Sequence, residues 1–189
     1  MTIFERLNEL RNHGGSARTT GLTDAAIRKF SEQDARLAEA VSDAHEAFRQ
    51  LLEEEPDLLA MDEEAQAEYI QEGYVNFYAH DAVNPYVSLA AAGPWIVTLK
   101  GAVIYDAGGY GMIGAGHAPV EVLDAMNRRH VMANIMTPNI SQKRLMRMLR
   151  REIGHTRGVC PFDSFICVNS GSEAVTVAAR LSDINAKLM

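Results

Sequence analysis

The residues best suited to chemistry stand in a short turn, Ser170, Gly171 and Ser172, between an apolar run and a helix-like run. Residues 165–168 have the length and residue types of a buried strand, and Ser170 or Ser172 can cap the helix that follows. The first turn of a helix carries free N–H groups at the positive end of its dipole, and glycine allows a ligand to approach the backbone closely. The turn is therefore a candidate phosphate site, although a simple helix cap fits the same pattern.

A second candidate lies in a glycine-dense stretch, residues 107–117, which holds five glycines among eleven residues. This density indicates either close approach of the backbone to a ligand or another chain, or several positions with positive φ. Residues 109–114 also match the GxGxxG pattern, but no βαβ unit with a suitable acidic residue follows, so we expect no dinucleotide there. We expect His117, beside this stretch, to be a hydrogen-bonded structural residue.

Other classes of site are not indicated. The six histidines are scattered, Cys160 and Cys167 lack CxxC spacing, and neither HExxH nor GxSxG occurs, so we expect no metal centre and no acyl-transfer serine. Two cysteines suit a reducing compartment, with Cys167 as a small core residue. There is no signal-peptide pattern and no apolar run of about 20 residues, so we expect a cytoplasmic protein without a membrane partner.

The elements that must position these residues differ in charge along the chain. Residues 1–80 contain 7 Lys and Arg against 17 Asp and Glu, a net charge of −10, whereas residues 81–189 contain 11 against 8, a net charge of +3. Apolar spacing predicts acidic helices over residues 1–12, from Thr23 to about residue 52, and over residues 62–73. The acidic residues are typical of solvated helix faces or, alternatively, of an arm that packs on a partner subunit.

The later part of the chain predicts a hairpin and further helices. The residue types predict two strands, over residues 95–99 and 102–106, joined by a tight turn. A helix follows Pro119, with an inward side expected for Val122, Leu123 and Met126. A second helix, over residues 142–153, has a basic face. We expect that face to be solvated or to contact a subunit rather than nucleic acid, because no aromatic side chains are interleaved with it.

In order along the chain, these motifs resemble the N-terminal part of the class III pyridoxal-phosphate-dependent aminotransferases, enzymes of fold type I that include the ornithine, acetylornithine and 4-aminobutyrate aminotransferases. The similarity covers about residues 93–183. It rests on Gly101, YD at 105–106, GG at 108–109, GHA at 116–118, EVLDAM at 121–126, NSGSEA at 169–174 and AAR at 178–180. Pro119 and Val120 stand where the family has His and Pro, and Val175 stands where it often has Asn.

The resemblance implies that Ser170, Gly171 and Ser172 bind the phosphate of pyridoxal 5'-phosphate through backbone N–H groups. It also implies that Tyr110 borders the substrate pocket, with a plain packing role as the alternative. The expected reaction is transfer of an amino group between an amino acid or amine and a 2-oxo acid, in a homodimer. The alternatives are a related aminomutase, decarboxylase or epimerase, or a non-catalytic helical interaction module.

The resemblance further implies an incomplete α/β fold of type I. An acidic helical extension would span residues 1–75, the N-terminal part of the small domain residues 76–153, and the start of the large cofactor-binding domain residues 154–189. None of the lysines stands in the sequence context of the family's Schiff-base lysine: these are Lys29, Lys100, Lys143 and Lys187. We therefore expect a fragment, or one part of a split enzyme, without a catalytic lysine and inactive alone.

Overall fold

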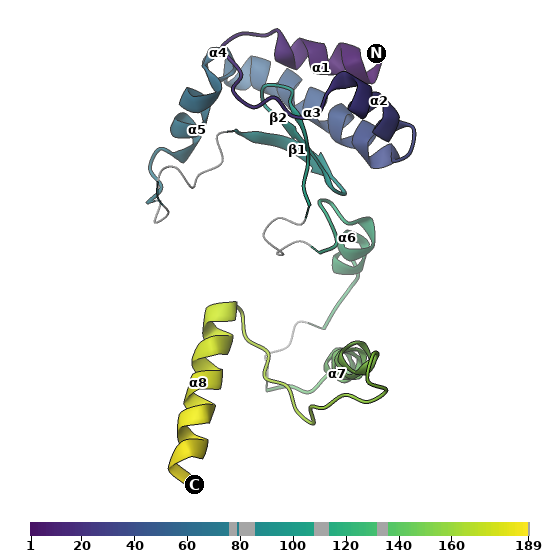
Figure 1. Ribbon diagram of the computed structural model, residues 1–189, viewed down its shortest axis with the longest axis vertical. Coiled ribbons are helices and arrows are strands. Elements are labelled where there is room, and N and C mark those ends of the chain that lie inside the picture. Colours follow the sequence, from purple (N-terminus) through teal and green to yellow (C-terminus); the bar gives the residue numbers. More distant parts are fainter. Residues whose placement is uncertain (76–78, 80–85, 108–113, 132–135, 189) are drawn as a thin grey trace. The chain divides into compact units, whose positions relative to one another are not determined.

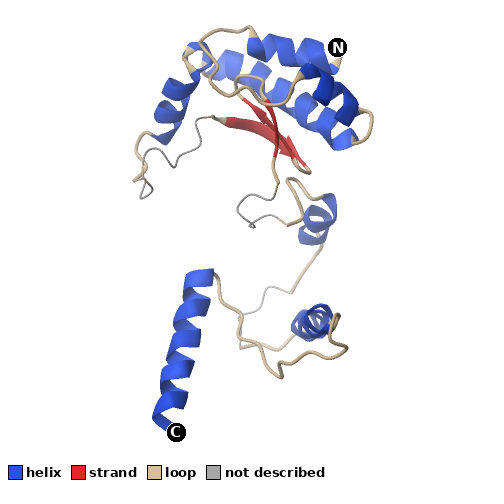
Figure 2. Ribbon diagram, in the orientation of Figure 1, coloured by secondary structure: helices blue, strands red, loops and turns tan. Residues whose placement is uncertain are grey.

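The computed structural model describes residues 1–75, 79, 86–107, 114–131 and 136–188. It divides into two compact units, Met1–Arg128 and Arg129–Met189, and each is considered by itself. Helices and a small antiparallel sheet are combined, as the predicted α/β class requires at this coarse level (Figure 2). The N-terminal helices and the strands that follow them share one core, so the first unit extends across the predicted division at residue 75.

The first helices begin at capping residues that the sequence shows plainly. Helix α1, Ile3–Arg11, starts with a capping box in which Thr2 and Glu5 each accept the other's backbone N–H. Helix α2, Asp24–Ser31, is capped by Thr23, as predicted. The predicted helix from Thr23 to residue 52 is in fact two helices, because Asp34 caps a new one, α3, which spans Ala35–Glu54.

Helix α3 is the element around which the first unit packs (Figure 1). Its buried side chains recur at intervals of three and four residues, which places them on one face: these are Leu37, Ala40, Val41, Ala44 and Phe48. It contacts α1 and α2 and also the strands β1 and β2. Pro56 ends the helix as predicted and opens α4, Pro56–Ala60, after which α5 spans Glu63–Gln71.

The sheet has three antiparallel strands in the order β1-β2-β3, with bounds Ser88–Ala92, Trp95–Thr98 and Val103–Tyr105. The predicted hairpin of β2 and β3 is confirmed, with Trp95 opposite Tyr105. The first strand was not predicted, because its sequence, SLAAA, has neither alternation nor β-branched residues. Every residue of β2 is buried, since this strand lies in the middle of the sheet and packs on α3.

Among the described residues, three helices follow the sheet: α6 Val120–Met126, α7 Ile140–Gly154 and α8 Gly171–Leu188. The prediction that Val122, Leu123 and Met126 face inward is wrong, because all three are exposed. In the second unit, Gly154 is the only buried residue among those described, and Cys167 is exposed rather than part of a core.

The strand predicted over residues 165–168 is also wrong, since this segment is irregular. No strand occurs elsewhere in the described residues of the second unit, so the backbone of residues 165–168 has no partner strand there. Ile166 is correspondingly exposed.

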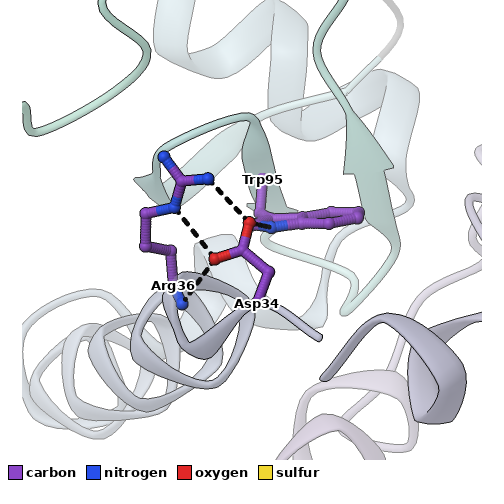
Figure 3. Close-up of polar contacts among 3 residues, drawn as sticks. All are labelled: Asp34, Arg36 and Trp95. Carbon is purple, nitrogen blue, oxygen red and sulfur yellow. Dashed lines mark hydrogen bonds and ion pairs between the residues drawn. The ribbon is translucent and has the colours of Figure 1, made fainter. Parts of the chain in front are cut away.

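A polar contact joins the start of α3 to the hairpin (Figure 3). The carboxylate of Asp34 caps α3 and accepts two hydrogen bonds from the Arg36 guanidinium, each at 2.9 Å. It also accepts the indole N–H of Trp95 at 2.9 Å. Hydrogen bonds from Arg36 first, and then from Trp95, lower the pKa of Asp34 from 3.8 to about 2.

We expect the Asp34→Ala substitution to lower the free energy of unfolding by about 2 kcal/mol, because it removes a helix cap and leaves the Trp95 indole without its acceptor. Urea unfolding followed by the fluorescence of Trp95, the only tryptophan, measures this. Asp34→Asn, which keeps an acceptor oxygen, should cost less than half as much. Equal losses in the two variants would contradict this account of the contact.

The same contact makes the stability of the first unit depend on pH. The folded pKa of Asp34 lies below its unfolded value, so the contact's stabilisation is complete above about pH 4 and is lost as the pH falls through about 2. We expect the wild-type chain to lose stability over this range and Asp34→Asn to lose less. Urea midpoints between pH 2 and pH 5 measure the difference, and parallel curves for the two proteins would contradict it.

Candidate functional site

The predicted phosphate site lies at the start of α8, where the capping residue is Ser170. Its hydroxyl oxygen accepts the backbone N–H of Glu173 at 3.2 Å, and its carbonyl accepts the N–H of Ala174 at 3.1 Å. The Glu173 carboxylate reaches back to accept the N–H of Asn169 at 2.8 Å. The sequence left Ser170 and Ser172 open as caps, and the structure assigns the cap to Ser170.

The two residues after the cap leave their backbone N–H groups available. In the described part of the chain, no hydrogen bond occupies the N–H of Gly171 or Ser172, and both residues are exposed. A Cβ at Gly171 would meet no atom within 4 Å, so the space in front of the backbone is open. Two free donors at the positive end of an 18-residue helix can hold an anion, and they fit a phosphate group.

An apolar cavity of about 250 Å³ runs along the side of α8 rather than across its first turn. One wall comes from the irregular segment before the helix and the other from the helix itself: the lining residues are Ser164, Ile166, Val168, Ala174, Val177, Ala178 and Leu181. Apart from the Ser164 hydroxyl, its side chains offer no polar group. The cavity can therefore contribute apolar contact beside the helix start but no chemistry of its own.

None of the lysines is joined to the phosphate site by a hydrogen bond or ion pair in the described structure. Lys187 lies in the last turn of α8, about 24 Å along the helix from Gly171 at 1.5 Å per residue. Lys100 is buried in the first unit, where its ammonium group donates to the carbonyl oxygens of Gly14 at 2.5 Å and Leu59 at 3.1 Å. Burial lowers its pKa, while Asp62 and Glu63 oppose the shift, so Lys100 serves the fold.

The glycine-dense stretch is described only in part. Tyr110 and most of the GxGxxG match lie outside the described residues, so the expected substrate contact of Tyr110 stays a prediction. His117 is described, and its hydrogen-bonded role is confirmed, because its Nε2 lies 2.9 Å from Oδ2 of Asp106. The sequence did not indicate Asp106 as its partner, and only the shared position beside the glycines could have suggested the pair.

Acidic residues at the start of α5 form a second cluster, which the sequence did not indicate. Glu63 is 1% exposed, contrary to the predicted solvated face, and its Oε2 accepts the N–H groups of Arg18 and Thr19 at 2.6 Å each. The neighbouring Asp62 accepts the backbone N–H and the hydroxyl of Ser16, and these bonds lower its pKa. The two carboxylates thus fasten the loop over residues 16–19 onto α5.

Beside this cluster lies an open cleft of about 560 Å³, lined by Ser16, Ala17, Arg18, Asp62, Glu63, Glu64, Ala65 and Glu68. No group of three or more His, Cys, Asp or Glu side chains suited to a metal ion occurs in the described residues. The second carboxylate oxygen of Glu63, Oε1, has no hydrogen-bond partner, but it is buried and so is not exposed to the cleft. The cleft is lined mainly by carboxylates, and its one cationic side chain, Arg18, is paired with Glu64.

Comparison with protein families, with curated proteins and with solved structures finds no match to this chain. Support for a family thus comes from the sequence motifs alone. In the described residues, no helix combines the length and apolar character needed to cross a membrane.

We expect Glu63→Ala to lower the free energy of unfolding by about 2–4 kcal/mol, because it leaves two backbone N–H groups without their acceptor in a partly buried loop. The adjacent Glu64→Ala removes only an exposed ion pair with Arg18 and should change stability by less than about 1 kcal/mol. Urea unfolding of the two variants at neutral pH provides the comparison. Similar effects in both would show that Glu63 does not anchor the loop.

Proposed function

We propose that this chain is the N-terminal part of a class III aminotransferase of fold type I, which uses pyridoxal 5'-phosphate to move an amino group between an amino acid or amine and a 2-oxo acid. The observation that carries the proposal is the pair of free N–H groups at Gly171 and Ser172, within the NSGSEA motif and at the start of a long helix. The proposed enzyme is a cytoplasmic homodimer, as in the family it resembles.

The proposed task of this chain is to hold the phosphate. A phosphate dianion placed before α8 would accept the N–H groups of Gly171 and Ser172 and interact favourably with the helix dipole. The Ser170 hydroxyl accepts from Glu173 but keeps its own hydrogen for donation to a phosphate oxygen. When bound, the cofactor supplies an electron sink for the reacting carbon of the substrate.

The residues that complete the reaction are not found in the described site. Lys100 is buried in the first unit, and Lys187 lies far along α8 from the phosphate position. We therefore propose that this chain contributes phosphate binding and orientation, and that the cofactor-bearing lysine lies outside it. The chain alone should bind phosphate-bearing ligands without catalysing amino transfer.

Phosphate binding can be tested without reaction at any lysine by using pyridoxamine 5'-phosphate, which has no aldehyde. We expect it to shift the backbone amide signals of Gly171 and Ser172 in NMR titrations, whereas pyridoxamine, which lacks the phosphate, should not. Gly171→Pro removes one N–H at a helix position that accepts proline and should weaken binding at least tenfold. Gly171→Ala keeps the N–H, meets no neighbouring atom and should bind within about threefold of wild type.

Two outcomes would contradict the phosphate site. One is equal binding of pyridoxamine with and without its phosphate, and the other is unchanged binding by Gly171→Pro. Either would leave the helix start as a simple cap and would favour the alternative of a non-catalytic interaction module, to which the exposed apolar side chains of α7 and α8 are suited.

Lysine labelling tests the second part of the proposal. After incubation with pyridoxal phosphate and reduction with borohydride, we expect partial labelling spread over the exposed lysines, Lys29, Lys143 and Lys187, and protection of the buried Lys100. Peptide mapping by mass spectrometry gives the distribution. A single stoichiometric adduct that supports turnover would show that this chain holds its own catalytic lysine.

A further inference from the structure

Three buried polar atoms beside the loop over residues 16–19 have no hydrogen-bond partner. They are Oε1 of Glu63, Oε1 of Gln66 and the hydroxyl oxygen of Thr19, and no other buried side-chain atom in the described residues lacks a partner. Glu63 is 1% exposed and Gln66 is fully buried, so solvent at the surface does not satisfy their oxygens. Leaving such an atom unpaired costs free energy, and in native proteins the missing partner is commonly an internal water.

The three atoms belong to one small region. Glu63 and Gln66 lie three residues apart on α5, where side chains at this spacing are neighbours on the helix surface. The other carboxylate oxygen of Glu63 accepts the backbone N–H of Thr19 at 2.6 Å, so Thr19 lies beside the same carboxylate. Nε2 of Gln66 donates to the carbonyl of Leu58 at 2.9 Å, and this bond fixes the amide with Oε1 as the atom that lacks a partner.

A buried cation with a spare donor lies next to these atoms. The ammonium group of Lys100 donates to the carbonyl oxygens of Gly14 and Leu59, which uses two of its three N–H bonds. Burial lowers the pKa of Lys100, and the charges of Asp62 and Glu63 oppose that shift, so both carboxylates lie near the ammonium. Within the described residues, however, no ion pair joins Lys100 to either carboxylate. The third N–H therefore points to a group that stands between the charges.

The chemistry of the missing partner is narrowly defined. It has to accept the third N–H of Lys100 and also donate to two oxygens, one from a carboxylate and one from an amide, neither of which can donate. A metal ion or an ammonium ion cannot accept an N–H, and its charge would be repelled by Lys100. A water molecule has two donors and two acceptors, and the Thr19 hydroxyl can supply its fourth hydrogen bond. Water is thus the ligand that satisfies all the groups at once.

We propose that an internal water molecule binds among Lys100, Glu63, Gln66 and Thr19, accepting from the ammonium and donating to both Oε1 atoms. It forms a water-mediated ion pair between the turn that joins β2 to β3 and the start of α5. The same carboxylate holds the loop over residues 16–19, so the water connects three segments that are distant in the sequence. Glu63 also lines the cleft beside α5, which gives the water a route to solvent. The site is independent of the proposed cofactor function.

A crystal structure of the full 189-residue chain, at a resolution that shows surface waters, tests the site directly. We expect one electron-density peak within hydrogen-bond distance of Nζ of Lys100, Oε1 of Glu63 and Oε1 of Gln66. Thallium(I), an anomalous scatterer that replaces monovalent cations, should give no peak at this position. Direct contact of the ammonium with Oε1 of Glu63, or a thallium peak between them, would overturn the proposal.

A double-mutant cycle detects the same water in solution. Lys100→Met and Gln66→Met each keep an unbranched side chain while removing one partner of the water. No printed hydrogen bond joins the two residues directly, so a bridging group must couple them. We expect the double variant to raise the unfolding equilibrium constant less than the product of the two single effects, by a factor of at least about five. Urea unfolding followed by the fluorescence of Trp95 gives the constants.

The exposed Gln71, in the same helix, provides the matched control. Gln71→Met removes an equivalent amide that faces solvent, so its effect should combine with that of Lys100→Met additively, within about twofold. Thr19→Val, which removes only a hydroxyl, replaces Lys100→Met in the cycle with Gln66→Met if the lysine variant does not fold. Additive effects in the cycle with Gln66→Met, or equal coupling for Gln71→Met, would overturn the proposal.

Discussion

The carboxylate of Asp34 is the interaction on which the arrangement of the first unit depends. It begins α3, the helix that packs on both the N-terminal helices and the sheet, and it also binds the indole of Trp95 in the central strand. Its partner Arg36 lies against the turn at Gly93, to which His117 is attached by two backbone hydrogen bonds. One side chain thus links the helical layer, the hairpin and the turn at Gly93.

Much of this fold could be predicted from local signals, and the failures have physical causes. Capping residues and apolar spacing marked α1, α2 and α5, and the strand-turn-strand pattern marked the hairpin. The alanine-rich β1 was not predicted, because its strand conformation depends on pairing with β2 rather than on the residue types of β1 itself. The segment over residues 165–168 shows the opposite error, since strand-like residues without a partner strand remain irregular.

The candidate site likewise has features that the local sequence predicts and features that depend on the folded structure. The helix start at Ser170 is local, and its sequence predicts both the cap and the free donors that follow. The pairing of His117 with Asp106 depends on how the chain returns to the hairpin 11 residues later, and the burial of Glu63 depends on its contact with the loop over residues 16–19. A histidine beside glycines and a glutamate in an acidic run give no sign of either in the sequence, because charge runs usually remain solvated.

The contact between Asp34 and Trp95 also constrains the order in which the first unit assembles. It joins residues 61 positions apart, so it closes a large loop whose entropic cost must be met before the contact can contribute. The helices can form from local interactions on a much shorter timescale than this closure. We therefore expect the reciprocal backbone bonds between His117 and Gly93, which need the completed turn at Gly93, to form after the helices.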